Sequence, residues 1–591
     1  MDAARRALDN FNNAVGSSTF GRIFRLEGSG HEKEIKNTRF TTEIRAGLTT
    51  FFTMAYIIAV NASILSDSGG TCECNDPTGG KDPFCDNNAE YTACVQDLNR
   101  SLITATAAIA GFSSFLFGFL TNLPVCLAPG MGLNAYFAYQ IVGYHGSGII
   151  TYRMALTAVF VEGFIFIFLS LIGMRQWLVK VIPQSLKIAC ACGIGLFLSE
   201  IGLSYSAGIG AITGSKTTPL EVAGCPTQYL VDGVCESHKM TNPTMWIGIF
   251  CGGVVTAYLM TYKVKAAMIA GIALVSIMSW PRTTSFTYFP YDAAGTDRWN
   301  FFRKVANFHP IDASLNALDW DISKDPSHFV LALFTFLYVD IIDCTATLYS
   351  MARFAGVVDP ETGDFPRSTL AYCTDALCIS VGSLLGTSPV TAFIESGAGI
   401  AEGGKTGLTA MTCGICFFIS MFFAPIFASI PPWATGCTLV LVGCLMMRQI
   451  VNVNWRYIGD AVPAFVTVMF IPFGYSAAYG LIAGLMTYTA LNGLVYLTKV
   501  ITRGYIVPDD EDQREYWTIV PHGRLPWFIR ATQDVAAHFG HTHNVKADDA
   551  STKSGGSQER FRSDSKGSNT ELDTVVVIPR DPRDEKVLRK M

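Results

Sequence analysis

Hydrophobic stretches of about 20 residues recur along most of this chain, and short polar or basic segments separate them. A helix needs roughly 20 apolar residues to cross the hydrocarbon core of a bilayer. The pattern therefore predicts an all-α polytopic membrane protein with about fourteen transmembrane helices. Continuous spans are expected near 44–65, 101–120, 152–173, 183–204, 243–261, 265–281, 335–356, 368–384, 407–430 and 433–448, and two more within 462–497.

Two further apolar segments are interrupted by proline and glycine: LPVCLAPGMGLNAYFAYQIVG at 123–143 and GTSPVTAFIESGAGIAEGG at 386–404. YIIAVNASIL at 56–65 aligns without gaps on DIIDCTATLY at 340–349, and each interrupted segment comes two segments after its repeat. Seven spans in each half give the halves opposite orientations. Inverted repeats with paired broken helices are typical of transporters whose binding site lies between the breaks. We therefore expect a 7+7 inverted repeat with two broken helices.

The apolar stretch 335–356 carries two carboxylates in its middle. Phe336, Asp340, Asp343 and Thr347 follow one another at spacings of four, three and four, which places them on one helical face. Ionised groups at membrane depth are costly and mark substrate or ion pathways. We expect this face to form the wall of a binding site.

The two interrupted segments add polar groups to the predicted site. In the second, Ser388 suits an N-cap and Pro389 the first helical position, so a half-helix is expected to start there, with Glu395 about two turns inside it. Thr387 is an alternative cap. In the first, Asn134 offers both a donor and an acceptor.

Three carboxyl groups, an amide, hydroxyls and aromatic rings thus meet at the predicted site, with no Lys or Arg at membrane depth. This inventory argues against an anionic substrate and favours a planar, uncharged solute whose ring edge donates N–H bonds to carboxylates. Close carboxyl groups in a dry site cannot all ionise, so at least one should carry a proton. We therefore expect a proton-coupled importer.

Composition and charge support a membrane carrier over other classes. Only 15% of the 591 residues are charged, against roughly 25% in soluble proteins. The net charge of −5 indicates no particular partner, and zinc-ligand spacing, a Walker loop and a dinucleotide fingerprint are missing from the sequence. We expect no enzyme activity, no cofactor and no nucleic-acid partner. Basic residues before the first span, and an even number of spans, place both termini in the cytoplasm.

Six cysteines lie in two polar loops that are expected to face the exterior. Cys72, Cys74, Cys85 and Cys94 lie in the loop 66–100, and Cys225 and Cys235 lie in the loop 205–242. An oxidising exterior would allow disulfides in both loops, and four cysteines permit three pairings, which stay open here. A glycosylation sequon at Asn99 directly precedes the next span, so little use of it is expected.

Three motifs carry a family resemblance. APGMGLNAYFAY, FLYVDIIDCTATLYSMARFAG and GSLLGTSPVTAFIESGAGIAEGGKTGLTA closely resemble the AzgA-like purine permeases of the nucleobase–cation symporter group. The resemblance covers roughly residues 20–500. It implies proton symport of adenine, guanine and hypoxanthine by a homodimer in the plasma membrane. It also implies substrate binding by Asn134, Asp340 and Glu395, with Asp343 as an essential acid.

The resemblance also implies a core domain of spans 1 to 4 and 8 to 11 and a gate domain of spans 5 to 7 and 12 to 14. The expected layout is a cytoplasmic segment 1–42, core 43–173, gate 174–281, an extracellular loop 282–326, core 327–430, gate 431–502 and a cytoplasmic, largely disordered tail 503–591.

The helix pattern and the family resemblance together define the expected site. The predicted substrate-binding residues are Asn134, Phe336, Asp340, Thr387, Phe393 and Glu395, and the predicted proton carriers are Asp343 and Asp340. Carriage of cytokinins (N6-substituted adenines) or of xanthine, uric acid or uracil on the same fold is the first alternative. An anion exchanger or channel is less consistent with three carboxyl groups.

Overall fold

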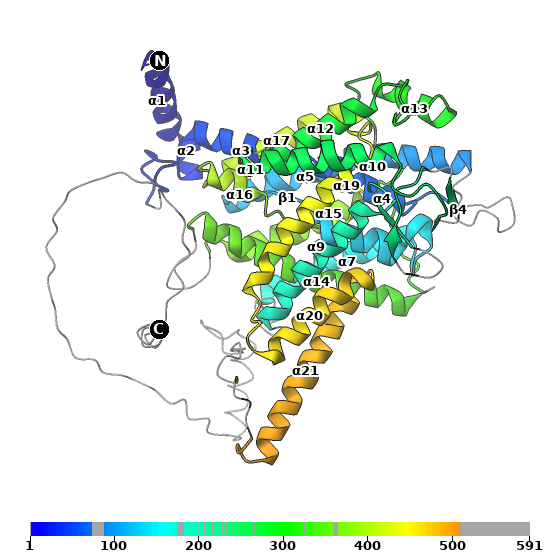
Figure 1. Cartoon of the computed structure of the whole chain (residues 1–591). Coiled ribbons are helices and arrows are strands. Elements are labelled where there is room, and N and C mark those ends of the chain that lie inside the picture. The colour runs from blue at the N-terminus through cyan, green and yellow to red at the C-terminus, as the bar shows by residue number, and fades with distance from the viewer. Residues whose placement is uncertain are drawn as a thin grey trace, which may run out of the picture. The chain divides into compact units, whose positions relative to one another are not determined.

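A computed structural model describes residues 2–506, 508 and 510, except for 33, 74–87, 174–182, 206–207, 215–217, 219, 227–228, 232–233, 265, 324 and 358–364. Cys74 and Cys85 lie outside the described residues, as does nearly all of the tail that was expected to be disordered. The described chain is mostly helical, with six short strands (Figure 1).

The first half contains the segments predicted as spans 1 to 7. Its elements are α1 (Asp2–Gly16), α2 (Thr19–Phe24), α3 (Phe40–Met54), α4 (Ile57–Asp67), α5 (Ala89–Thr121), β1 (Leu127–Pro129), α6 (Met131–Ala135), η1 (Tyr136–Val142), η2 (Tyr144–Gly146), α7 (Tyr152–Ile172), α9 (Gln184–Leu203), β2 (Ile212–Thr213), β3 (Glu221–Val222), β4 (Leu230–Val231), β5 (Val234–Cys235), α10 (Pro243–Ile247), η4 (Gly248–Val254), α11 (Val255–Thr261) and α12 (Ala267–Ser279).

The second half contains the segments predicted as spans 8 to 14. Its elements are α13 (Ala293–Phe302), α14 (Pro326–Phe354), α15 (Ser368–Leu384), β6 (Val390–Ala392), α16 (Ser396–Ala401), α17 (Gly407–Ser420), η5 (Met421–Phe423), α18 (Ala424–Phe427), α19 (Pro432–Met447), η6 (Arg448–Asn452), α20 (Ile458–Phe473) and α21 (Ala477–Ile501).

In the described part of the chain, a helix or a broken segment lies at each of the fourteen predicted spans. Nine helices in the described part of the chain are long and apolar enough to cross a membrane. The shorter helices α12, α15 and α20 and the two broken segments complete the set. Two predicted loops contain helical residues: α5 begins at Ala89, within the predicted loop 66–100, and α13 lies within the predicted loop 282–326.

Helix packing repeats between the halves in the way an inverted repeat requires. Span 2 packs on span 11 (α5 on α17), and its symmetry equivalent, span 9 on span 4, is the contact of α15 with α7. Small residues allow these helices to approach closely. A Cβ atom built on Gly118 of α5 would lie 2.5 Å from the carbonyl oxygen of Gly407 in α17. The fold is therefore a 7+7 inverted repeat.

Most helix contacts fall within two groups. One group, here called the first helix set, comprises α3 to α7 and α14 to α18 with the strands β1 and β6. The other, the second helix set, comprises α9 to α12 and α19 to α21. Smaller contacts, such as α6 with α9 and α3 with α12, join the two sets. The assignment of core and gate domains stays a prediction.

The two interrupted segments meet in a short antiparallel ladder at the centre of the first helix set. Leu127 of β1 lies opposite Ala392 of β6, and Pro129 opposite Val390. Backbone polar groups inside a membrane must find partners within the protein, and this pairing supplies them on both breaks. The ladder thus joins the two repeats at the level where the binding site is expected.

The ladder also corrects the predicted start of the second half-helix. Ser388 does not cap a helix, because residues 390–392 are extended and paired with β1. The helix α16 begins at Ser396, with Glu395 at its N-cap position rather than two turns inside it. The backbone N–H of Phe393 continues the pairing by donating to the Cys126 carbonyl at 3.0 Å.

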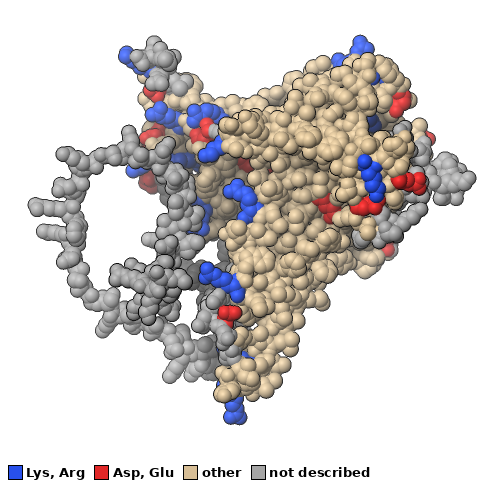
Figure 2. Space-filling view, in the orientation of Figure 1, with Lys and Arg blue, Asp and Glu red and all other residues tan. Residues whose placement is uncertain are grey.

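The two ends of the helix bundle differ in charge and covalent structure. Figure 1 places α1, α2 and α16 at one end and α13 and β4 at the other, and Figure 2 shows many Lys and Arg side chains at the first end. Disulfides join Cys72 to Cys94 and Cys225 to Cys235 in the two loops where they were expected. The sequon residue Asn99 lies within α5 and donates to the Ser66 hydroxyl at 3.1 Å.

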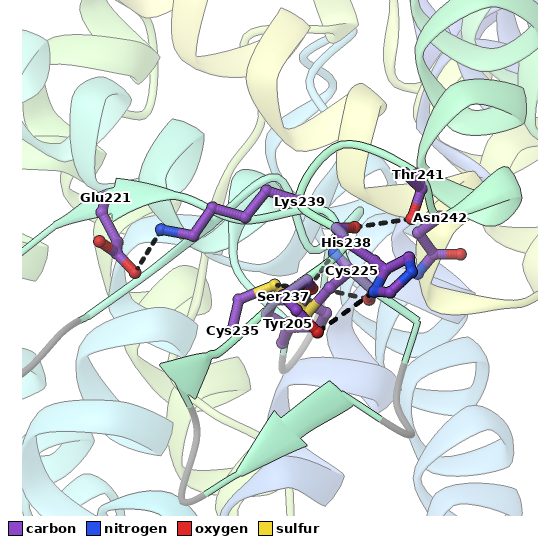
Figure 3. The surroundings of a disulfide bond; sticks show 9 residues. All are labelled: Tyr205, Glu221, Cys225, Cys235, Ser237, His238, Lys239, Thr241 and Asn242. Atoms are coloured by element: carbon purple, nitrogen blue, oxygen red, sulfur yellow. Dashed lines mark hydrogen bonds and ion pairs between the residues drawn. A yellow bond between two sulfur atoms is a disulfide. The ribbon is translucent and has the colours of Figure 1, made fainter.

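The second disulfide lies in the connection between α9 and α10 (Figure 3). The Tyr205 hydroxyl donates to the Cys225 carbonyl at 3.0 Å and accepts the Cys225 backbone N–H at 2.8 Å. Burial raises the pKa of Tyr205, so its hydroxyl keeps its proton at neutral pH. Lys239 pairs with Glu221 at 3.0 Å, and the disulfide, hydroxyl and ion pair together brace the loop.

Candidate functional site

A cavity of about 290 Å³ opens at the boundary between the two helix sets, close to the lower limit of roughly 300 Å³ for ligand pockets. The first set contributes Thr53, Glu395 and Gly397 to its wall, and the second contributes Met260, Lys263 and Met268. Lys263 is exposed in the turn between α11 and α12. The cavity thus runs from the end of the protein that bears this turn to the second break.

Glu395 is the carboxylate on the cavity wall, and a tyrosine positions it. The Tyr56 hydroxyl donates to Glu395 Oε1 at 2.9 Å. Tyr56 lies at the joint between α3 and α4 and is buried. Sequence reasoning missed Tyr56, although the repeat alignment places it opposite Asp340 and could have pointed to it.

The predicted stripe on α14 divides between two environments. Asp343 and Thr347 are half-buried, and Asp343 lies within electrostatic range of Glu395 and of Cys190 on α9. Asp340 is fully buried and faces the interior of the first helix set. Three residues along a helix rotate a side chain by roughly 60° from its neighbour on the same face. That rotation is enough to direct Asp343 to the set boundary and Asp340 away from it.

The aromatic member of the stripe also lies in the interior. Phe336 is fully buried, and its ring centroid lies 5.3 Å from that of Tyr136 and 6.0 Å from that of Phe137. This packing ties α14 to the first broken segment. Phe336 is not among the residues that line the cavity.

Asn134 reaches the first break with one polar atom unused. Its side-chain N–H donates to the Asn61 carbonyl at 3.4 Å, while its Oδ1 is buried and has no hydrogen-bond partner among the described residues. Asn61 in turn donates to the Thr106 hydroxyl at 2.7 Å and accepts from the Ser388 hydroxyl at 3.4 Å. Asn61, a second residue that sequence reasoning missed, therefore links both breaks.

The two remaining predicted residues lie at the second break. The Thr387 hydroxyl donates to the Gly382 carbonyl at 3.0 Å and closes the end of α15. The Phe393 side chain is buried beside the ladder. The structure therefore brings Glu395 and Asp343 to the set boundary and places Asn134, Asp340, Thr387, Phe336 and Phe393 in the interior around it.

The set boundary is closely packed at the end opposite the cavity. A space of only about 10 Å³ lies there among η1, α14 and α21, lined by residues that include Tyr136, His328 and Tyr479. Access to Glu395 through the cavity and packing at the opposite end are what one state of an alternating-access carrier requires.

Comparison with known proteins gives consistent matches. A family model described as "Permease family" matches residues 88–483. The chain is 59% identical to "Efflux pump notK'" of Aspergillus versicolor, over 88% of this chain and 91% of that protein. It is 56% identical to "Putative xanthine/uracil permease C887.17" of Schizosaccharomyces pombe, over 89% and 84%. It is 31% identical to "Adenine permease AdeQ" of Escherichia coli, over 80% and 90%.

Proposed function

The chain belongs to the Permease family, and from this premise we propose that it carries purine nucleobases across the membrane together with protons. Family membership makes it a multi-pass membrane transporter of the nucleobase type, not an enzyme. The proposal concerns the substrates, adenine, guanine and hypoxanthine, and the coupling to protons.

The observation that carries the proposal is the Glu395 carboxylate on the cavity wall, oriented by Tyr56 and within electrostatic range of Asp343. A carboxylate with one oxygen already held by a hydroxyl presents its remaining acceptor sites in a fixed direction. The N–H groups on the edge of a purine ring match such acceptors. The unpartnered Oδ1 of Asn134 is a further acceptor.

Asp340 stays in the proposal as a substrate-side acid that is covered in this state. Both of its carboxyl oxygens are buried and have no hydrogen-bond partner in the part of the chain that the structure describes. A modest rearrangement of α14 on substrate binding would let it accept an N–H bond, since Asp343 on the same helix already faces the set boundary.

A second candidate function differs in the direction of transport and in the transported solute. The relative that is 59% identical is named an efflux pump, which favours outward transport. A relative that is 56% identical is named a putative xanthine/uracil permease, which favours xanthine or uracil. Cytokinins and uric acid also have a planar ring that bears N–H groups, so the uptake experiment below applies to them as well. Lys263, the basic residue of the cavity wall, is exposed at its mouth, so an anion exchanger has less support.

For the transport cycle, we propose that the first helix set is the core and the second is the gate. The cavity lies on the boundary between the sets, and both breaks lie within the core. Rocking of core against gate would close this cavity and open the boundary near Tyr136 and Tyr479. The gate would also supply the homodimer contact.

We further propose a plasma-membrane location with both termini in the cytoplasm. The positively charged end of the protein carries α1 and α2 (Figure 2), which is the cytoplasmic end by the positive-inside rule. In this orientation the cavity opens to the cytoplasm and both disulfides lie outside, where oxidising conditions maintain them.

Radiolabelled adenine uptake in cells that lack their own purine transport tests the proposal. We expect saturable uptake that an uncoupler abolishes and that unlabelled guanine and hypoxanthine inhibit. Competition by xanthine, uracil or a cytokinin in place of these purines would move the substrate assignment to that solute. Release from preloaded cells without uptake would support the efflux candidate, and neither uptake nor release of any of these bases would refute the proposal.

A further inference from the structure

Three carboxyl groups meet inside the first helix set, on the side of Asp340 that faces away from the gate. They are Glu162 of α7, Asp340 of α14 and Asp375 of α15, here called the acid triad, and all three are 0% exposed. Electrostatic interaction couples Glu162 to Asp375, and Asp340 to both. The triad belongs to helices that move together in the proposed cycle.

Helix packing explains why these groups meet. Gly163, next to Glu162, allows α7 to approach α15 so closely that an added Cβ would lie 2.6 Å from the Ala376 carbonyl oxygen. From the other side, Cys344 Sγ, one turn after Asp340 on α14, donates to Asp375 Oδ2 at 2.9 Å. Three separate helices therefore direct their acids at one point.

Two of the three acids in the triad, Glu162 and Asp340, lack hydrogen-bond partners in the described part of the chain. Both carboxyl oxygens of Glu162 and both of Asp340 are buried without a hydrogen-bond partner in the described part of the chain. Neither Glu162 nor Asp340 forms an ion pair among the described residues. In the described part of the chain, Asp343 and the thiols of Cys344 and Cys378 also interact with these acids, and none of these three groups carries a positive charge.

Buried acids in this arrangement need a positively charged ligand. Carboxylates without a cation or hydrogen bonds are strongly disfavoured in a low-dielectric interior, and three neighbours cannot all be ionised. Among the described residues, no three His, Cys, Asp or Glu side chains are placed so that they could hold a metal ion. A proton fits instead, because it converts one carboxylate to a donor for its neighbour.

We propose that Glu162 and Asp375 form, with Asp340, the binding site of the coupling proton, apart from Glu395 on the cavity wall; Asp340 is the residue that this site shares with base binding. This inference rests on the proposed function. The proton binds one carboxylate oxygen and is shared with an adjacent carboxylate through an O–H···O hydrogen bond. Its release returns a negative charge to the triad, and no other bond forms or breaks.

The helix α14 links this site to the substrate. Asp340 belongs to the triad, and Asp343, three residues further along, lies within electrostatic range of Glu395. A negative charge on the triad repels the negative charges of the Asp343 and Glu395 carboxylates. This repulsion disfavours binding of a base that needs both carboxylates as acceptors in fixed positions. A proton on the triad removes this repulsion, so proton binding and base binding reinforce each other.

The test compares coupling with binding in the purified full-length protein, reconstituted in liposomes and supplied with adenine. Glu162→Gln keeps the size of the side chain and removes its ability to release a proton. We expect this variant to retain adenine counterflow within about threefold of wild type and to lose accumulation driven by a pH gradient at least tenfold. Glu200→Gln is the matched control, since Glu200 is a buried carboxyl group on α9, outside the triad; it should retain both activities.

The outcomes separate the acid triad from the proposed transport function. Gradient-driven accumulation by Glu162→Gln at the wild-type level would overturn the triad, as would an equal loss in Glu200→Gln. If Glu162→Gln elutes as aggregate, Asp375→Asn takes its place under the same criterion, and wild-type coupling in that variant would refute the triad. Failure of wild-type protein to bind or exchange adenine would instead refute the proposed function, because that result does not depend on Glu162.

Discussion

Replacing Tyr56 by phenylalanine isolates the hydrogen bond that positions Glu395. The change removes one hydroxyl and keeps a ring that is only 3% exposed, so packing is retained. The lost bond has a donor–acceptor distance of 2.9 Å and a carboxylate acceptor. Hydrogen bonds to charged groups contribute about 1.5–3 kcal/mol, and about 1.4 kcal/mol corresponds to tenfold in Kd. If the bond holds Glu395 in its binding orientation, Tyr56→Phe should weaken adenine binding roughly tenfold or more.

The assay is equilibrium binding of radiolabelled adenine to purified protein at one fixed pH, with the elution profile as the check on folding. Tyr139→Phe is the matched control, because the Tyr139 hydroxyl donates to Asp67 Oδ2 at 2.7 Å, a carboxylate that does not line the cavity. The control should bind adenine within about twofold of wild type. Wild-type affinity in a well-folded Tyr56→Phe variant would refute the positioning role.

A double-mutant cycle adds a second criterion. Glu395→Gln removes the charge that Tyr56 holds, so Tyr56→Phe should weaken binding much less in that background than alone. Equal effects in both backgrounds would show that Tyr56 acts through some other group.

Two further predictions test the access path and the loop disulfide. Ala398→Cys, on the cavity wall, should react with a membrane-impermeant thiol reagent added from the cytoplasmic face, and adenine should slow the reaction; reaction only from the outer face would contradict the proposed orientation. Cys225→Ser should lower the thermal midpoint of the protein, because closing even a short loop by a disulfide stabilises by about 2–4 kcal/mol, yet leave the Kd for adenine within about twofold, and a tenfold change in Kd would place this loop in the binding path.

The membrane architecture was predictable because hydropathy acts locally. Each span must bury its own backbone hydrogen bonds within a helix, so about 20 apolar residues identify it wherever it packs. The start of α5 was missed for the same reason. Its first turns, from Ala89, are polar. The helix start there is marked by the N-cap residue Asn88, whose side chain accepts hydrogen bonds from the backbone N–H groups of Glu90 and Tyr91.

The geometry of the breaks was not predictable from local sequence. Ser388 and Pro389 favour a helix start, but pairing with Leu127–Pro129, far away in the chain, holds Val390–Ala392 extended. The acids of α14 show the same limit. Spacing placed Asp340 and Asp343 on one face, and only the neighbouring helices determine that one meets Glu162 and the other meets Glu395.

The most direct test of the account is proton movement that accompanies adenine uptake. Liposomes containing the purified protein and a trapped pH-sensitive dye are given external adenine with no initial gradient. The account predicts acidification of the lumen in step with adenine entry, and loss of both signals in Glu395→Gln. Adenine entry without acidification would contradict proton symport, and unchanged entry in Glu395→Gln would contradict the site.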